Sequence, residues 1–393
     1  MNERFVSIAK RENNAKRGFL IVNPLQGKHV PVSPATALSV FDELAEKIIG
    51  KYKNENLLFI GFAETATAIG AEVAISSGFP YIQTTRENIQ DAEYIFFSEE
   101  HSHATEQILV KNDFDKVIFS TDRIIFVEDE VSTGKTIRNI IRKLTQLYEK
   151  KISFSVMSVL NGMTEDDKAQ YSDLNLNVDF IFLEKIDRTN FEKIASEFDS
   201  VLKRGEENQI DVSPVDFSKI GCKFFSVGGY MNARRLVDSI EYKNACERFA
   251  SDIIEKIGSP TGKKILVLGT EEFMYPAILT GKKIEQNGNF VRTHSTTRSP
   301  ISVFDSDSAS GCKKYPLYSR FTLASLYDEE RTTYIYNLDY YDKILIITDS
   351  SAGYSTDSST DSSIKEKNKK GLLSLINAVR KFSGDISVIR WEK

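Results

Sequence analysis

The chain has 393 residues, of which 41% are hydrophobic, 27% charged and 11% aromatic, and its formal net charge is −5. At about 100–200 residues per domain this length predicts two or three domains, and a composition close to the globular average excludes a disordered or fibrous chain. The slight acidity excludes a general nucleic-acid binder, which would show a strongly basic face.

Secreted and membrane-spanning proteins have features that this sequence lacks. No apolar run approaches the roughly 18 residues of a membrane helix, and the first residues contain no apolar stretch of the kind found in secretory signals. Three cysteines, Cys222, Cys246 and Cys312, are too few and too scattered for a disulfide framework or a zinc cluster. We therefore expect a cytoplasmic protein with no membrane partner.

Short apolar runs alternate with helical patterns in the first half, which predicts an α/β fold. Several runs are solidly apolar, as in parallel sheets covered on both faces. Strands are expected at Gly18–Val22, Asn56–Gly61, Tyr81–Thr84, Tyr94–Phe97, Arg123–Glu128, Ile152–Leu160 and Val178–Leu183. Helices are expected at Ala35–Gly50, Thr65–Ser77 and Thr136–Lys150.

The polar segment Lys203–Ser213 has no hydrophobic periodicity and predicts a boundary between domains at residues 1–205 and 206–393. The serine-rich stretch Ser350–Lys369 predicts a surface loop. The second half repeats the plan of the first. Its strands are expected at Lys264–Gly269, Phe290–Thr293, Thr333–Asn337, Lys343–Asp349 and Ile386–Trp391, and its helices at Tyr242–Ile257 and Lys370–Phe382.

The strongest motif is RIIFVEDEVSTGKT at residues 123–136, where an apolar strand ends in Glu128 and Asp129. A turn follows whose backbone amides and hydroxyls, from Ser132, Thr133 and Thr136, form an anion cradle at the start of a helix. Gly134 lets the backbone approach the anion closely. The two carboxylates upstream can accept hydrogen bonds from two hydroxyls, so the motif predicts a site for a ribose 5-phosphate.

Two other interpretations of this motif are weaker. A P-loop would need a glycine five residues before Gly134, and that position is Asp129, whose carboxylate would repel a polyphosphate. A surface turn that only caps a helix would explain the Ser and Thr residues, but it does not explain the buried strand and the paired acids.

Residues 124–136 resemble the signature of the type I phosphoribosyltransferases: four apolar residues, two acids and a Thr-Thr-Gly-x-Thr-like loop. The resemblance implies that Glu128 and Asp129 hold the ribose hydroxyls of phosphoribosyl pyrophosphate (PRPP), with Asp129 also near Mg²⁺. It implies that Ser132–Thr136, including Lys135, hold the 5-phosphate. Some purine-specific members carry an aspartate at the position of Ser132, so its absence favours the orotate-type branch.

The same resemblance assigns three further segments. A pyrophosphate-binding loop is expected at Phe62, Ala63, Glu64 and Thr65, although a carboxylate at Glu64 is unusual beside pyrophosphate. Arg86, after the next strand, is expected to contact the pyrophosphate, because a guanidinium pairs bidentately with phosphate oxygens. A catalytic loop is expected at 98–104, where His101 and His103 can donate a proton to the departing pyrophosphate. Taken singly, these segments also fit an ordinary turn, a surface arginine and two solvated histidines.

The second half echoes these segments in the same order. Leu268–Glu272 parallels Ile60–Glu64, Thr296–Arg298 parallels Thr84–Arg86, and Lys343–Asp349 parallels Arg123–Asp129. Here the first acid of the pair is replaced by Thr348, and the following loop is one residue shorter to its glycine. We therefore expect a second, degenerate phosphoribosyltransferase-like domain with Arg298 and Asp349 at its site.

The string Thr297-Arg298-Ser299-Pro300 is the motif that names the TRSP domain. The whole chain resembles the fusions of an orotate-type phosphoribosyltransferase domain with a TRSP domain that occur in bacterial tellurium-resistance and stress gene clusters. This resemblance implies Mg²⁺-dependent transfer of ribose 5-phosphate from PRPP to an unidentified small-molecule acceptor, in nucleotide-like metabolism. A homodimer and partner enzymes of the same pathway are possible. The alternative is a regulatory module that senses PRPP or a nucleotide without turnover.

Overall fold

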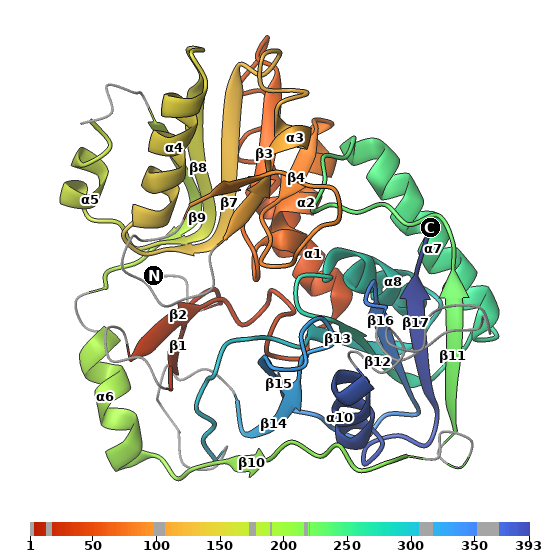
Figure 1. Cartoon of the computed structure of the whole chain (residues 1–393). Coiled ribbons are helices and arrows are strands. Elements are labelled where there is room, and N and C mark those ends of the chain that lie inside the picture. Colours follow the sequence, from red (N-terminus) through yellow and green to blue (C-terminus); the bar gives the residue numbers. More distant parts are fainter. Residues whose placement is uncertain are drawn as a thin grey trace. The chain divides into compact units, whose positions relative to one another are not determined.

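Two five-stranded parallel sheets form the framework of the chain in the computed structural model (Figure 1). The structure describes residues 4–12, 18–97, 107–172, 178–188, 191–215, 219, 221–305, 317–351 and 369–393. One compact unit contains Met1–Val6, Leu38–Thr189 and Met231–Asn244, and the other contains Ser7–Ala37, Asn190–Tyr230 and Ala245–Lys393. The sheets confirm the predicted α/β fold, whereas the division into residues 1–205 and 206–393 stays a prediction.

The sheet of the first unit has the strand order β4-β3-β7-β8-β9. Its strands are β3 (Leu57–Gly61), β4 (Tyr81–Gln83), β7 (Arg123–Val131), β8 (Ser153–Asn161) and β9 (Val178–Lys185). The chain passes from β3 to β4 on one side and from β7 to β8 on the other. The carboxyl ends of β3 and β7 therefore lie at the point where the winding direction reverses, which is where open parallel sheets bind ligands.

Helices α2 (Thr67–Ser77), α3 (Lys111–Phe114), α4 (Lys135–Leu147) and α5 (Glu165–Ala169) accompany this sheet, together with the hairpin of β5 (Tyr94–Phe96) and β6 (Ile108–Val110). In the core, the rings of Phe126 on β7 and Phe154 on β8 stack with their centroids 6.1 Å apart. Both faces of these strands are buried along their central residues, which explains why apolar and polar residues do not alternate there in the sequence.

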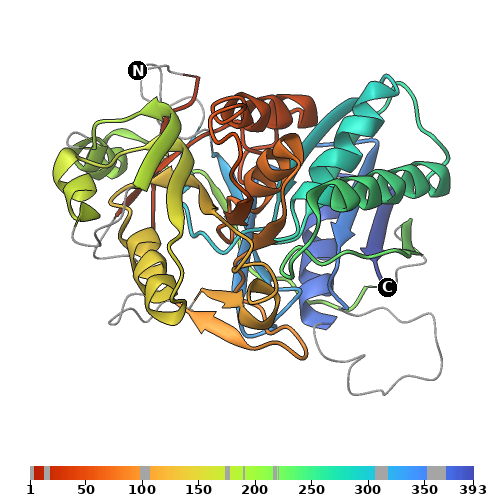
Figure 2. The same ribbon diagram turned by 90° about the horizontal axis from the view of Figure 1, so that it is seen from above.

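The sheet of the second unit has the order β11-β17-β16-β12-β13. Its strands are β11 (Cys222–Val227), β12 (Lys264–Gly269), β13 (Phe290–Ser295), β16 (Lys343–Thr348) and β17 (Ile386–Trp391). Helices α7 (Ser239–Lys256) and α8 (Tyr275–Gln286) lie side by side on one face, where Phe249 stacks on Trp391 at 4.6 Å, and α10 (Lys369–Val379) packs on the other (Figure 2).

Further elements complete this unit. Strands β1 (Ser7–Lys10) and β2 (Phe19–Val22) form an antiparallel hairpin that contacts α6 (Phe191–Val201). A small three-stranded sheet has the order β10 (Glu206–Asn208), β14 (Ser319–Ala324) and β15 (Thr332–Tyr336). Strand β10 lies inside the polar segment Lys203–Ser213, whose lack of periodicity did not predict a strand. Helix α1 (Pro34–Ala45) starts in this unit and continues into the other one.

Strand registers confirm the internal repeat. In the first sheet Gly61 pairs with Val127. In the second sheet Leu268 pairs with Ile346, which sets Gly269 opposite Ile347. Counting two residues onward along β7 and β16 makes Asp349 the equivalent of Asp129, as the sequence predicts. The order differs at one edge only, because β9 follows the repeat in the first sheet whereas β11 precedes it in the second.

Several predicted boundaries differ from those observed. Helix α1 ends at Ala45 rather than Gly50, α2 begins at Thr67, and β7 continues through the acidic pair to Val131. Helix α8 was not predicted, because eight of its residues are buried and it has no polar face that would reveal a helical period. The predicted serine-rich loop lies mostly outside the described residues.

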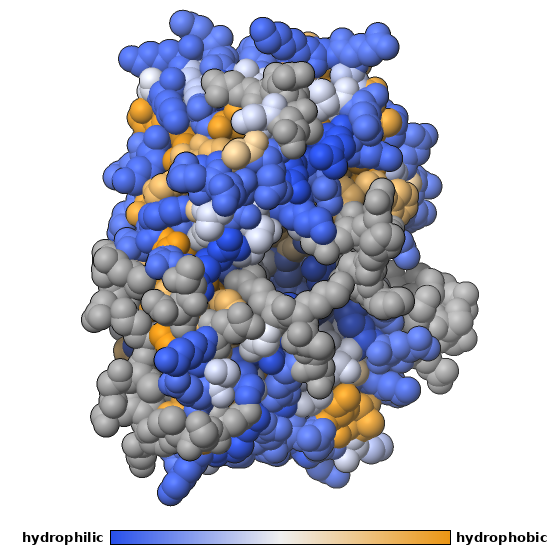
Figure 3. All heavy atoms as spheres, turned by 90° about the vertical axis from the view of Figure 1, so that its left-hand side faces the viewer, coloured by the Kyte–Doolittle hydropathy of each residue, from blue (hydrophilic) through white to orange (hydrophobic). Residues whose placement is uncertain are grey.

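None of the described helices combines the length and apolar character needed to cross a membrane. The face drawn in Figure 3 is mainly hydrophilic, with its apolar side chains in small separate areas.

Candidate active site

Three loops meet at the carboxyl edge of the first sheet. They follow β3, β4 and β7, which are neighbours in the order β4-β3-β7. A backbone hydrogen bond of 3.0 Å from Phe62 to Val127 joins the first loop to β7, and one of 2.9 Å from Thr84 to Gly61 joins the second loop to β3. The structure therefore brings the predicted segments 62–65, 86 and 128–136 to one edge of one sheet.

The loop after β3 is shaped by close packing behind it. A side chain at Gly61 would meet the hydroxyl of Tyr81 at 2.5 Å, and Tyr81 in turn donates to the Thr67 carbonyl of α2 at 2.8 Å. Phe62 is fully buried, with its ring between Phe97 and Phe126. Its side chain thus belongs to the core, so only its backbone can lie near a ligand.

The side chain of Thr84 supports the same loop. Its hydroxyl accepts a hydrogen bond of 2.8 Å from the Ala63 amide, and Thr84 is fully buried. Glu64 and Thr65 are partly exposed, and the peptide between Ala63 and Glu64 is cis. Arg86 lies two residues beyond Thr84 and is also partly exposed. Sequence reasoning missed the role of Thr84, although its repetition at Thr296 was a signal for it.

The paired acids occupy the end of β7. Glu128 and Asp129 are both partly exposed, and a Glu128 carboxylate oxygen accepts a hydrogen bond of 3.0 Å from the Asp129 amide. Burial, followed by the charge of Asp129, raises the pKa of the Glu128 carboxyl well above its ordinary value. The pair is therefore poised to gain from a ligand that neutralises charge or donates hydrogen bonds.

The turn after β7 opens α4 through Gly134, which has φ +68° and caps the helix. The Tyr171 hydroxyl donates to the Gly134 carbonyl at 2.6 Å, and Tyr171 is buried. Because an added Cβ at Gly134 would lie 2.6 Å from that hydroxyl, only glycine fits the turn. Helix α4 begins at this edge of the sheet, and the first amides of a helix have no carbonyl partner within the helix, as an anion site requires.

The other residues predicted to hold the 5-phosphate lie in or next to this turn. Ser132, Lys135 and Thr136 lie at the start of α4, and the Lys135 amide donates to the Thr133 hydroxyl at 3.4 Å. The apolar stripe of α4, formed by Ile137, Ile140, Ile141 and Leu144, anchors the helix on the sheet. Sequence reasoning missed Tyr171, which is distant in the chain and has no motif around it. His101 and His103 lie outside the described residues, so their assignment stays a prediction.

The described residues contain no group of three or more His, Cys, Asp or Glu side chains that would hold a metal ion by themselves. The donor set of Glu128 and Asp129 nevertheless suits Mg²⁺, which proteins commonly bind through one or two carboxylates plus oxygens of a phosphate substrate. The residues present therefore fit a magnesium ion that arrives with its substrate.

The equivalent edge of the second sheet keeps the same backbone support. The Thr296 hydroxyl accepts a hydrogen bond of 3.0 Å from the Glu271 amide, as Thr84 does from Ala63. Glu271 thus takes the place of Ala63, and its carboxylate is 1% exposed. It pairs with Arg298 at 2.7 Å and accepts from the Ser325 hydroxyl at 2.5 Å.

Further side chains of the chain itself contact the polar groups at the carboxyl edge of the second sheet. Glu272 lies 3.5 Å from Arg298, and the Lys28 ammonium donates to the Glu271 carbonyl at 2.8 Å. The carboxylate of Asp349 accepts hydrogen bonds from the hydroxyls of Tyr327 at 2.5 Å and Tyr230 at 2.6 Å. The two residues predicted for a degenerate site, Arg298 and Asp349, therefore both bind side chains of the chain itself.

Comparison with known families gives two matches. Residues 5–185 match a family described as phosphoribosyl transferase, and residues 235–361 match the TRSP domain found on the carboxyl side of that family. No curated protein matches the chain.

Among solved structures, the chain is similar to several adenine phosphoribosyltransferases. The one from Rhodothermus marinus is 13% identical with a TM-score of 0.32, and the match covers 46% of this chain and 94% of that one. The one from Leishmania tarentolae is 14% identical with a TM-score of 0.32, covering 49% and 88%. The one from Thermoanaerobacter pseudethanolicus is 20% identical with a TM-score of 0.29, covering 39% and 82%.

Proposed function

The chain belongs to the phosphoribosyltransferases that carry a TRSP domain on their carboxyl side and is a pentosyltransferase-type enzyme, and on this basis we propose which reaction its first half performs. The proposed reaction moves ribose 5-phosphate from PRPP to a base-like acceptor and releases pyrophosphate. One observation supports this proposal most: two carboxylates, the loop that carries Arg86 and the glycine turn that begins α4 lie together at the carboxyl edge of the first sheet, where its winding direction reverses.

Each loop has a separate task in this proposal. The turn at 132–136 and the amino end of α4 bind the 5-phosphate, because helix amides and hydroxyls there donate to an anion. Glu128 and Asp129 accept hydrogen bonds from the ribose hydroxyls. Arg86 and the peptide units after Ala63 contact the pyrophosphate. Asp129 helps to hold Mg²⁺, which supplies neutralisation of the leaving-group charge when it is bound.

The chemical step exchanges one bond at the ribose C1 atom for another. The bond from C1 to the pyrophosphate oxygen breaks and leaves its electron pair on the pyrophosphate, while a nucleophilic atom of the acceptor bonds to C1. Positive charge develops on the ribose, so the carboxylates of Glu128 and Asp129 stabilise the transition state electrostatically. Holding both reactants on fixed strand ends supplies the orientation that the reaction needs.

We further propose that PRPP binds only to the first half. In the second half the Glu271 and Glu272 carboxylates already neutralise Arg298, and a pyrophosphate would meet two negative charges. The hydroxyls of Tyr230 and Tyr327 occupy the Asp349 oxygens that ribose hydroxyls would need. Breaking these buried pairs would cost more than a second PRPP returns.

The deciding experiment measures PRPP binding by calorimetry and pyrophosphate release with candidate bases, with and without EDTA. We expect one PRPP per chain, and release that stops when EDTA removes Mg²⁺. Mass spectrometry of small molecules that copurify with the chain would supply acceptor candidates. Tight PRPP binding without release for any acceptor would instead support the sensing module, and two PRPP per chain would contradict the closed second site.

A matched pair of variants tests the assignment of the acids. Asp129→Asn should weaken PRPP binding at least tenfold, since a hydrogen bond to a charged group contributes about 1.5–3 kcal/mol. Asp122→Asn makes the same chemical change just before β7, at the opposite end of that strand, where Asp122 caps the Asn56 amide at 2.8 Å. It should leave binding unchanged. Equal PRPP affinity in the two variants would refute the assignment.

A further inference from the structure

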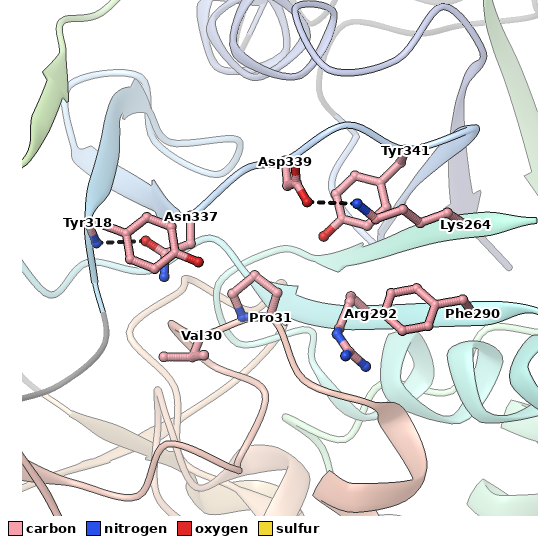
Figure 4. A pocket seen from close by; sticks show the side chains of 9 residues that line it. All are labelled: Val30, Pro31, Lys264, Phe290, Arg292, Tyr318, Asn337, Asp339 and Tyr341. Carbon is pink, nitrogen blue, oxygen red and sulfur yellow. Dashed lines mark hydrogen bonds and ion pairs between the residues drawn. The ribbon is translucent and has the colours of Figure 1, made fainter. Parts of the chain in front are cut away.

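A cavity lies in the second unit, at the amino ends of β12 and β13 and thus at the edge opposite Asp349. Its volume is about 290 Å³. Its walls come from the segment before α1, from the first residues of two strands and from the chain on either side of β14 and β15. The lining residues are Val30, Pro31, Lys264, Phe290, Arg292, Tyr318, Asn337, Asp339 and Tyr341 (Figure 4).

The side chains from the sheet point to one face. Lys264 and Phe290 pair across β12 and β13, and Arg292 is two residues beyond Phe290 on the same strand. Side chains two residues apart in a strand share a face, so Phe290 and Arg292 project together. The guanidinium of Arg292 lies 4.2 Å from the centre of the Phe290 ring. This arrangement holds a cation and an aromatic ring side by side at the rim of the cavity.

The opposite wall is fixed by hydrogen bonds. Asn337 is buried with φ 50°, and its side-chain oxygen accepts hydrogen bonds from the Tyr318 amide at 2.9 Å and the Ser319 amide at 3.3 Å. The segment that carries Pro31 is fixed by paired hydrogen bonds of 3.1 and 2.8 Å between Val32 and Thr293. These hydrogen bonds fix the backbone on both sides of the cavity.

The two cations of the cavity differ in how they are compensated. The Lys264 ammonium is 2.7 Å from the Asp339 carboxylate and lies over the Tyr341 ring. This contact holds the pKa of the Asp339 carboxyl below its ordinary value, so the pair is ionised and carries no net charge. Arg292, by contrast, has no carboxylate within ion-pairing distance among the described residues. Of the two cations in the described lining, only Arg292 is thus without a neutralising carboxylate.

Two aromatic rings of the cavity are exposed to an unusual degree. Phe290 is 51% exposed and Tyr318 is 48% exposed, and Figure 4 shows them on either side of Pro31. Flat aromatic faces beside an arginine are the features with which proteins stack a nucleobase and hold a phosphate. We propose that this cavity binds a mononucleotide, with its base against an exposed aromatic ring and its phosphate on Arg292.

The volume restricts the ligand to one nucleotide. Pockets for small molecules usually measure about 300–1,000 Å³, and this cavity lies at the lower limit of that range. A dinucleotide or an oligonucleotide would extend into solvent and leave most of its charge without a partner. The choice of a mononucleotide probe rests on the proposed function, whose product is nucleotide-like, whereas the cavity itself does not depend on it.

The test must separate this cavity from the PRPP site, which would also bind a mononucleotide. Binding of AMP and UMP is therefore measured by calorimetry on the full chain carrying Gly134→Ala, which disables the phosphate turn of the first sheet. Asp129→Asn serves as a second background if the first variant does not fold. We expect one nucleotide to bind in these backgrounds. No binding of either nucleotide would overturn the proposal.

Adding Arg292→Met to the same background should weaken nucleotide binding at least tenfold, because methionine keeps an apolar contact with Phe290 and removes the charge. The matched control is Arg248→Met, at an exposed arginine of α7, which should leave the affinity unchanged. Equal effects of the two variants would overturn the proposal. In the otherwise native chain, Arg292→Met should leave PRPP binding intact, so failure of this site and failure of the proposed reaction are distinguishable.

Two further probes separate the contributions of ring and phosphate. Ribose 5-phosphate lacks the base and the nucleoside lacks the phosphate, so each should bind at least tenfold more weakly than the mononucleotide. If ribose 5-phosphate binds as tightly as AMP and UMP, the aromatic walls are not the base site and the proposal is wrong.

Discussion

Substitution of Gly134 by alanine tests the phosphate turn most directly. The residue has φ +68°, and an added Cβ would lie 2.6 Å from the Tyr171 hydroxyl and 3.1 Å from the end of the Met163 side chain. Methionine can adapt to such a contact, but Tyr171 is buried and its hydroxyl is bonded to the Gly134 carbonyl. The tyrosine must therefore move and lose that hydrogen bond.

The magnitude follows from two contributions. A side chain in the left-handed region costs about 1–2 kcal/mol, and a lost hydrogen bond costs about 1 kcal/mol. A total of about 2–3 kcal/mol corresponds to a fall of roughly 4–12 °C in the melting temperature of a domain of this size. Because we propose that the turn also holds the 5-phosphate, PRPP affinity should fall about tenfold or more. Thermal unfolding and calorimetry measure the two effects separately.

A double-variant cycle identifies the cause. Tyr171→Phe removes the hydroxyl that an alanine at position 134 would meet, and by itself it should cost about 1 kcal/mol through the lost hydrogen bond. The combined variant should therefore be more stable than the sum of the single effects by about 1 kcal/mol. Additive losses, or an alanine variant with native stability and PRPP affinity, would refute the packing argument.

Two other changes give opposite effects on stability. Glu128→Gln should unfold at a temperature at least about 2 °C higher than the native chain at pH 8, because the raised pKa of Glu128 makes its ionisation unfavourable in the folded state. The gain should vanish below the ordinary pKa of a free glutamic acid, where Glu128 keeps its proton in the folded and the unfolded state. A gain that is equal at all pH values would contradict the role of this ionisation. Arg298→Met should destabilise the chain by about 3 kcal/mol, because it leaves the buried Glu271 carboxylate without its nearest cation, while PRPP binding persists. Denaturant unfolding against the exposed control Arg248→Met measures the second effect, and loss of PRPP binding in a folded Arg298→Met chain would show that the second half takes part in binding.

The sequence predicts best those helices and strands whose burial produces a periodic or continuous pattern of apolar residues. The strands β3, β7, β12 and β16 each contain a continuous apolar run because both faces of their sheets are covered, and all four were predicted. Strand β11 was missed because it lies at a sheet edge, is only partly buried and alternates little. Edge strands and fully buried helices have weak hydrophobic patterns in the sequence, so tertiary contacts determine their secondary structure.

The site was predictable as a set of loops but not as a set of contacts. The acids at the end of β7 and the glycine turn after them follow from local sequence, and their neighbours along the sheet follow from the rule for strand ends. By contrast, Tyr171 reaches Gly134 from 37 residues away in the chain, and no local pattern predicts that contact.

The second sheet repeats a motif of the first sheet but surrounds it with different side chains. The strings Thr84-Thr85-Arg86 and Thr296-Thr297-Arg298 are identical, and the first threonine of each supports its loop in the same way. What differs is the residue at the loop itself, alanine in the first sheet and glutamate in the second. A buried carboxylate at Glu271 needs a cation, and Arg298 lies 2.7 Å from it.

That single exchange has two consequences for the second sheet. It turns the arginine from a group available to an external anion into part of a buried ion pair, which is costly to break. It also gives Arg298 a structural task that persists without any ligand. Replacing both partners together, by Glu271→Ala and Arg298→Met, should therefore destabilise the chain less than Arg298→Met alone. Equal stability of the two variants would contradict the view that Glu271 is the reason Arg298 is retained.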